Sequence, residues 1–184
     1  MAGTIKLDGT TFLSKSGSDF TVDVGTDGSY ANGSINSNVT FPAGHIIQSV
    51  TSVTSDTDST TSSTYQDSST SQAITTVATN SKLLITVYSG MVLPQSNYLI
   101  TTIKRAITDG ATTTDLTGGY SDGMMRATES AWNPRYYEWI DAPSQSADTT
   151  ITYTAMFRNH DNSETIYFSH ENTFVRVSVY EITV

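Results

Sequence analysis

The most restrictive feature of the chain is an alternation of apolar and polar residues that recurs from residue 82 to residue 184, while no stretch repeats its apolar residues at helical spacing. Side chains on a strand point alternately to the two faces of a sheet, so this pattern predicts strands with one buried side. In ITYTAMFR, for example, Ile151, Tyr153 and Phe157 share one face. Six strands are predicted here: 82–89, 97–104, 136–141, 151–158, 164–168 and 173–184.

The composition favours the same fold class. Thr, Ser, Val, Ile and Tyr are common, whereas the strong helix formers Leu, Glu and Lys are scarce. Turn sequences such as Ser89-Gly90 and Asn133-Pro134 separate the strands. The chain has 184 residues, which is enough for one principal core. About eight strands of similar length then predict an all-β, jelly-roll-like antiparallel sandwich.

A smaller β-rich segment is expected before the sandwich. Residues 1–44 contain the strand-like pieces TIKL, DFTVDV and NVTF, frequent turn formers and few apolar side chains. Such a segment is marginal alone, so we expect it to pack against copies of itself or against another protein. Pro42 has no backbone N–H to donate to a neighbouring strand, and Gly44 permits a turn. The two residues therefore interrupt the strand-like stretch NVTFPAGHIIQSV. The sequence thus predicts a boundary between an attachment segment, 1–44, and a domain, 45–184.

The next stretch, 51–81, is so rich in Ser and Thr that composition alone would score it as a linker. Period-two alternation nevertheless predicts that the strand beginning at 45 continues to 55. The β-branched run AITTV predicts another strand at 73–77, and DTDSTTSS at 56–63 is expected to be a loop.

Charge and composition exclude several classes of partner. The chain has 18 acidic and 9 basic residues, a net charge of -9, so it would repel a nucleic-acid backbone. It has no cysteine, which excludes disulfides and thiolate metal sites. No window approaches the apolar length of a membrane span, and the first residues lack the apolar core of a secretion signal. We therefore expect a protein made in the cytoplasm, with neither nucleic acid nor membrane as partner.

Several stretches together carry a family resemblance. The chain from Val39 to Ile182 resembles small virion proteins of tailed phages, in particular the short, trimeric fibre-like or decoration proteins of marine and cyanobacterial phages. The most specific matching stretches are FPAGHIIQ, DAPSQSADTTITY and the terminal TFVRVSVYEI.

The resemblance implies a homotrimer at the surface of the phage particle, assembled in the host cytoplasm. Its residues 1–44 would bind a capsid or tail protein, and its carboxy-terminal jelly roll would be exposed. The resemblance is compatible with a head fibre and with a capsid decoration protein. The alternative is a receptor-binding tail fibre or tail-tip adhesin that recognises host surface glycan. The family's motifs are structural, so the resemblance implies no enzyme, no catalytic residue and no cofactor.

An aromatic cluster supplies the candidate glycan contacts Trp132, Tyr136 and Trp139. Aromatic rings beside polar groups suit a sugar-binding platform, but the same residues could pack in the core or between subunits. Period two places Tyr137 and Trp139 on one face of a strand and Tyr136 on the other. At most half of the cluster can then be exposed.

His45 follows Pro42 and Gly44 at the predicted junction. Near a trimer axis three copies of His45 could form a metal or anion site, and otherwise it is an ordinary histidine beside a corner. Three aspartates, Asp56, Asp58 and Asp67, offer oxygen ligands for calcium, although the spacing of an established calcium loop is absent. The alternative is that they keep a Ser/Thr-rich loop solvated.

The sequence argues against an enzyme. A glycosidase would need paired carboxyls, for which Glu129, Glu138 and Asp141 are the nearest candidates. Glu138 and Asp141 are three apart on a predicted strand, so they are expected on opposite faces. The pairs His160-Asp161 and His170-Glu171 are adjacent in sequence, and we expect them to be loop and surface residues whose side chains diverge.

The last predicted strand presents Val175, Val177 and Val179 on one face. Burying apolar surface stabilises an assembly by roughly 25 cal/mol per Å². We therefore expect this valine face to contribute to the trimer interface.

Overall fold

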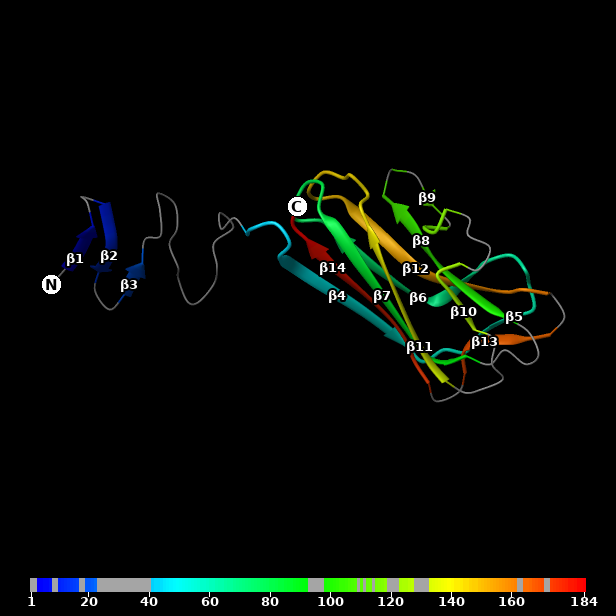
Figure 1. Cartoon of the computed structure of the whole chain (residues 1–184). Helices are drawn as coiled ribbons and strands as arrows, with labels where there is room; N and C mark the ends of the chain where they lie inside the picture. The colour runs from blue at the N-terminus through cyan, green and yellow to red at the C-terminus, as the bar shows by residue number, and fades with distance from the viewer. Residues whose placement is uncertain are drawn as a thin grey trace. The chain divides into compact units, whose positions relative to one another are not determined.

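The computed structural model is all-β, with no helix in the part of the chain that it describes, and it divides into two compact units, Met1–Phe41 and Pro42–Val184 (Figure 1). The sequence placed the boundary at 44, a few residues further along. The residues described are 3–7, 10–16, 19–22, 41–92, 98–108, 110, 112–113, 115–118, 123–127, 133–161, 164–170 and 173–184.

The first unit contains an antiparallel sheet of three strands in the order β1-β2-β3. These are β1 (Gly3–Leu7), β2 (Thr10–Ser16) and β3 (Asp19–Val22). The pieces TIKL and DFTVDV fall on β1 and β3, as their patterns predicted, whereas β2 was not predicted. Most of the third piece, NVTF, lies outside the described residues.

The second unit is a jelly roll, as the strand count and spacing predicted. Its two main sheets are antiparallel, with the strand orders β11-β7-β14-β4 and β10-β8-β12-β6, and β9 lies beside β8. A separate pair, β13-β5, completes the unit. The strands are β4 (Ile46–Thr54), β5 (Asp58–Thr60), β6 (Gln66–Thr75), β7 (Lys82–Val92), β8 (Leu99–Ile107), β9 (Thr112–Thr113), β10 (Met125–Ala127), β11 (Asn133–Asp141), β12 (Thr150–Asn159), β13 (Ile166–Ser169) and β14 (Val175–Ile182).

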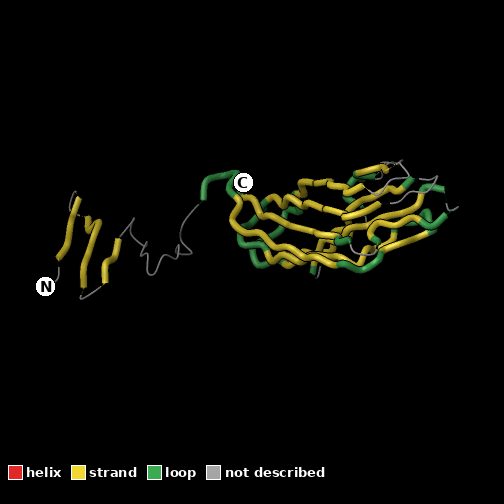
Figure 2. Tube along the Cα trace, turned by 90° about the horizontal axis from the view of Figure 1, so that it is seen from below, coloured by secondary structure: helices red, strands yellow, loops and turns green. Residues whose placement is uncertain are grey.

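The strand pairing identifies the topology. The first and last strands of the second unit, β4 and β14, pair with each other. Moving inward along the chain, β6 pairs with β12, β7 with β11 and β8 with β10. This nesting is what results when one long antiparallel hairpin is rolled into two facing sheets, which is the jelly-roll arrangement. Figure 2 shows the strands running alongside one another with loops at both ends.

The core lies between the inner faces of the two sheets. The inward residues of β12 include Ile151, Tyr153 and Phe157, all buried as their alternation predicted, and the Phe157 ring stacks on Phe168 with 5.2 Å between ring centres. The expected role of the terminal valine face is wrong. Val175, Val177 and Val179 are fully buried inside this core, so they cannot form a trimer interface.

The two ends of the jelly roll differ. At the entry end, defined by residues 42–48, 75–81 and 181–184, the Gly44 amide donates to the Thr183 carbonyl at 2.9 Å and the Thr183 hydroxyl donates to the Pro42 carbonyl at 2.7 Å. The corner at Pro42 and Gly44 therefore belongs to the second unit. Gly44 has a φ of 89°, a conformation that favours glycine. The opposite, loop end contains β5, β10, β13 and the turn after β12 (Figure 1).

The expected loop at 56–63 is in part a strand, because β5 (Asp58–Thr60) pairs with β13. The predicted strand at 73–77 is the end of a longer one, β6, which begins within the Ser/Thr-rich stretch at Gln66. Both differences involve residues whose β structure depends on partner strands about 75 to 110 positions away in the sequence, which local patterning cannot detect.

Candidate interaction site

An aromatic group lies on the outer face of the sheet β11-β7-β14-β4. Tyr136 on β11 is directly opposite Tyr88 on β7, and 55% of Tyr136 is exposed. The Tyr88 ring stacks on Phe174 with 5.0 Å between ring centres and 26° between planes. The Arg176 guanidinium carbon lies 5.8 Å from the Tyr88 ring centre. Together these four side chains form an exposed surface with the stacking rings and charged donor that polar ligands and protein partners use.

Two of the three predicted glycan contacts, Tyr136 and Trp139, lie on opposite faces of β11. Tyr136 is exposed, whereas Trp139 turns inward and packs against the core beside the buried Tyr137, as the period-two argument predicted. Trp132 lies outside the described residues. The ring directly across from Tyr136 is instead that of Tyr88, which in turn stacks on Phe174. Sequence reasoning missed these two rings because no local signal reveals which strands lie side by side.

Tyr136 also contacts the one acidic residue of its strand face. Its hydroxyl donates to Glu138 Oε2 at 2.7 Å, and this hydrogen bond is the main reason why the pKa of Tyr136 is raised above its usual value. Glu138 is exposed and Asp141 is buried, so the two carboxyls face opposite sides, as their spacing predicted. They are not a catalytic pair, and Glu129 lies outside the described residues.

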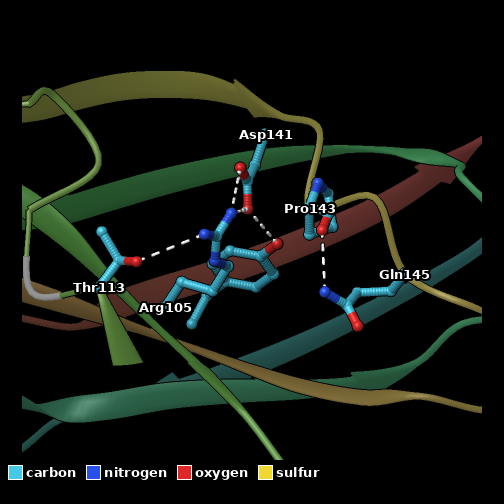
Figure 3. A network of polar contacts seen from close by, with 6 residues as sticks. Arg105, Thr113, Asp141, Pro143 and Gln145 are labelled. Carbon is cyan, nitrogen blue, oxygen red and sulfur yellow. Dashed lines mark hydrogen bonds and ion pairs between the residues drawn. The ribbon is translucent and has the colours of Figure 1, made fainter. Parts of the chain in front are cut away.

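Asp141 belongs to a buried polar cluster that ties the two sheets together (Figure 3). Arg105 Nη1 on β8 donates to both Asp141 oxygens, at 2.7 and 2.9 Å, and the Tyr153 hydroxyl on β12 donates to Asp141 Oδ2 at 2.7 Å. Arg105 Nη2 also donates to Thr113 at 3.3 Å. Burial, followed by the charge of Asp141, raises the pKa of Tyr153. Because its oxygens are occupied by partners in the domain, the Asp141 carboxylate acts as a structural tie.

A second buried carboxylate lies at the entry end. Glu181 on β14 accepts hydrogen bonds from the backbone amides of Val77 and Ala78 and from the side chains of Ser81 and Gln48. Burial by itself would raise the pKa of Glu181, but these hydrogen bonds outweigh it and hold the pKa below its usual value. Glu181 therefore fixes the turn between β6 and β7 to the last strand.

His45 lies at this same end. It is exposed, and its backbone amide donates to the Thr183 hydroxyl at 3.2 Å. The corner residues Pro42 and Gly44 are held by the same threonine. These hydrogen bonds hold the corner in place within a single chain. The placement of His45 on a trimer axis stays a prediction.

The aspartates considered for calcium bind three different partners. Asp58 accepts from the backbone amide and the hydroxyl of Ser69, Asp56 accepts from Thr54, and Asp67 forms an ion pair with Lys104. Burial raises the pKa of Asp58 despite the Ser69 hydrogen bonds. Across the described ranges no three His, Asp or Glu side chains are grouped so that they could hold a metal ion.

The loop end carries a mixed aromatic and charged group. The Arg126 guanidinium carbon lies 3.8 Å from the Tyr98 ring centre, and the His160 ring meets the edge of Tyr98 at 5.4 Å. His160 also pairs with Asp161. The two side chains were expected on the surface, where they lie, but their expected divergence is wrong, because they occupy a turn after β12 rather than a strand.

No protein-family model matches this sequence, and no curated protein matches it. In the part of the chain that the structure describes, no helix has the length and apolar character needed to cross a membrane.

Proposed function

We propose that this chain is a structural virion protein of a tailed phage, a homotrimeric head fibre or capsid decoration protein. Residues 1–44 attach it to a capsid or tail protein, and the jelly roll is exposed at the particle surface. Its work is assembly and adhesion rather than catalysis. The resemblance of FPAGHIIQ, DAPSQSADTTITY and the terminal strand to small virion proteins supports this proposal, and a jelly roll suits a displayed domain.

The observation that carries the proposal is the polarity of the jelly roll. The chain enters the domain at Pro42, where the corner is hydrogen-bonded to Thr183, so the covalent link to the first unit and the carboxy terminus share the entry end. The strands β5, β10 and β13 and the turn after β12 lie at the opposite, loop end (Figure 1). A domain linked to its anchor at one end leaves the loops of the opposite end clear of that link, which suits attachment and display.

Deletion of residues 1–40 tests the attachment. The shortened protein retains the whole second unit, so we expect it to be produced folded but to be absent from particles assembled in its presence. The full-length chain, produced at the same level, is the control. Incorporation of the shortened protein at the level of the control would refute the anchoring role.

A receptor-binding adhesin is the second candidate. The group of Tyr98, Arg126 and His160 at the loop end favours it, because an arginine and aromatic rings are suited to hydroxyl-rich ligands. We expect the full chain to bind host surface polysaccharide and Arg126→Ala to bind it more weakly. Lys104→Ala, on the outer side of the β10-β8-β12-β6 sheet, is the control. Absence of binding by the full chain at high micromolar concentration would count against this candidate.

A further inference from the structure

The outer faces of the two main sheets differ in character. Among the described residues, eight large apolar side chains are more than a third exposed. Five of them lie on or beside the outer face of β11-β7-β14-β4, and they are Ile46, Val53, Tyr136, Ile140 and Phe174. We call this surface the apolar face. The outer side of β6, on the other sheet, instead exposes Ser69, Ser71, Ala73 and Thr75.

Two rows of the apolar face cross the sheet, and a polar row of Thr51, Ser178, Thr86 and Glu138 lies between them. At one side Val53 on β4 pairs with Arg176 on β14, which pairs with Tyr88 on β7, which in turn pairs with Tyr136 on β11. A parallel row joins Tyr180, Leu84 and Ile140. Exposed apolar residues grouped on one face in this way are typical of interaction sites in soluble proteins.

Charge indicates what covers the face. The outward positions of its four strands carry two cations, Lys82 and Arg176, and one anion, Glu138, a net charge of +1. The whole chain has 18 acidic and 9 basic residues and a net charge of -9. Copies of so acidic a chain repel one another. Only one acidic residue lies at the outward positions of the apolar face, so a second copy meets little of that repulsion there.

The size of the face is also suitable. Four strands about 4.8 Å apart, each presenting about eight residues at about 3.4 Å per residue, give a surface of about 500 Å² before side-chain relief is counted. Stable complexes bury roughly 800 Å² per partner, which is of the same order.

We propose that the apolar face is the surface through which this chain associates with a second copy of itself. The inference rests on the proposed function in one respect, since both require copies of the chain to assemble. It assigns association to a surface other than the one expected at Val175, Val177 and Val179, because those side chains are buried in the core. Ile140, on the edge strand β11, is central to the test because its exposed side chain contributes to the face without filling the domain interior.

Native mass spectrometry of the full chain gives the first test. At micromolar concentration we expect the unmodified protein and Val77→Lys to be oligomeric and Ile140→Lys to be monomeric. The two substituted side chains are matched, because Ile140 is 59% and Val77 is 63% exposed, but Val77 lies at the entry end, off the apolar face. A monomeric unmodified chain, or an Ile140→Lys protein as oligomeric as Val77→Lys, would overturn the proposal.

Thiol labelling gives a second test that does not require a charged substitution. The chain has no cysteine, so Ile140→Cys and Val77→Cys each introduce a single reporter. With a bulky maleimide we expect at least about tenfold slower labelling at position 140, because a copy of the chain covers it. Equal rates would overturn the proposal. Protection at position 140 only after addition of polysaccharide would also overturn it, in favour of a glycan platform.

The results of these two tests can be distinguished from a failure of the proposed function. Loss of particle incorporation on deleting residues 1–40 concerns the first unit, whereas labelling at position 140 reports only on the jelly roll. If the full chain assembles through the apolar face but never joins particles, the virion assignment fails and this inference stands.

Discussion

Glu181 links two neighbouring segments to the last strand with one carboxylate. Its oxygens accept from the Val77 and Ala78 amides and the Ser81 hydroxyl, at distances of 2.7 to 3.0 Å. In Glu181→Gln an amide group would replace one acceptor and face these donors. We expect the free energy of unfolding to fall by about 2 kcal/mol, measured by urea denaturation. An unchanged value would contradict the assigned role.

The same carboxylate predicts a pH dependence. The pKa of Glu181 is lower in the folded chain than its ordinary value of 4.5, so its contribution to stability is complete above that value and is lost as the pH falls through the folded pKa. We expect the difference in unfolding free energy between wild type and Glu181→Gln to narrow below pH 4.5. Comparing the two proteins cancels the opposite effect of Asp58, whose pKa is raised. A difference that grows with acidity would exclude this assignment.

Asp141 and Glu138 offer a matched comparison on one strand. Asp141→Asn would leave the Arg105 charge without its bidentate partner in a site where Asp141 is only 7% exposed. We expect a loss of about 3 kcal/mol in unfolding free energy. Glu138→Gln, at an exposed position, is expected to change it by less than about 0.5 kcal/mol. Equal effects in thermal or urea denaturation would show that the buried tie is not important.

At the scale of elements, two glycines are needed for different reasons. Gly44 has a positive φ, and at Gly90 the backbone and side chains of neighbouring residues come too close for a Cβ. A Cβ on Gly44 would meet nothing within 4 Å, so Gly44→Ala carries only the penalty of its positive φ, about 1 kcal/mol. A Cβ on Gly90 would lie 2.8 Å from the Thr173 Cβ and 2.9 Å from the Phe174 amide nitrogen. We therefore expect Gly90→Ala to lower the unfolding midpoint more than Gly44→Ala. The reverse order would contradict this description of both turns.

The elements that were predictable are those whose pattern is local. Strands β7, β8, β11, β12, β13 and β14 each followed from alternation in their own residues. Strand β5 was predicted as loop because DST has no apolar signal and is ordered by pairing with β13. Strand β2 was also missed, although it lies between two predicted pieces. Strand formation there depends on a neighbouring strand more than on intrinsic preference.

At the scale of the whole molecule, the second unit contains its own core and its own corner at Pro42. Deleting residues 1–40 is therefore expected to leave the thermal unfolding midpoint of the jelly roll within about 2 °C of the full-length value, measured at equal protein concentration. The β-sheet circular dichroism of the second unit should persist as well. A large fall in the midpoint would mean that residues 1–40 contribute to the stability of the jelly roll.

The sequence by itself determined which residues face inward on each strand, because the period of two is a property of the extended backbone. It therefore predicted that Tyr136 and Trp139 lie on opposite faces of their strand, and that Glu138 and Asp141 do so too. Only the tertiary structure decided what each face meets. Val175, Val177 and Val179 were recognisable as an apolar face, but whether that face packs within the domain or between copies depends on which sheet lies over it. That choice is made by long-range packing of strands separated by many residues, for which a single strand carries no signal.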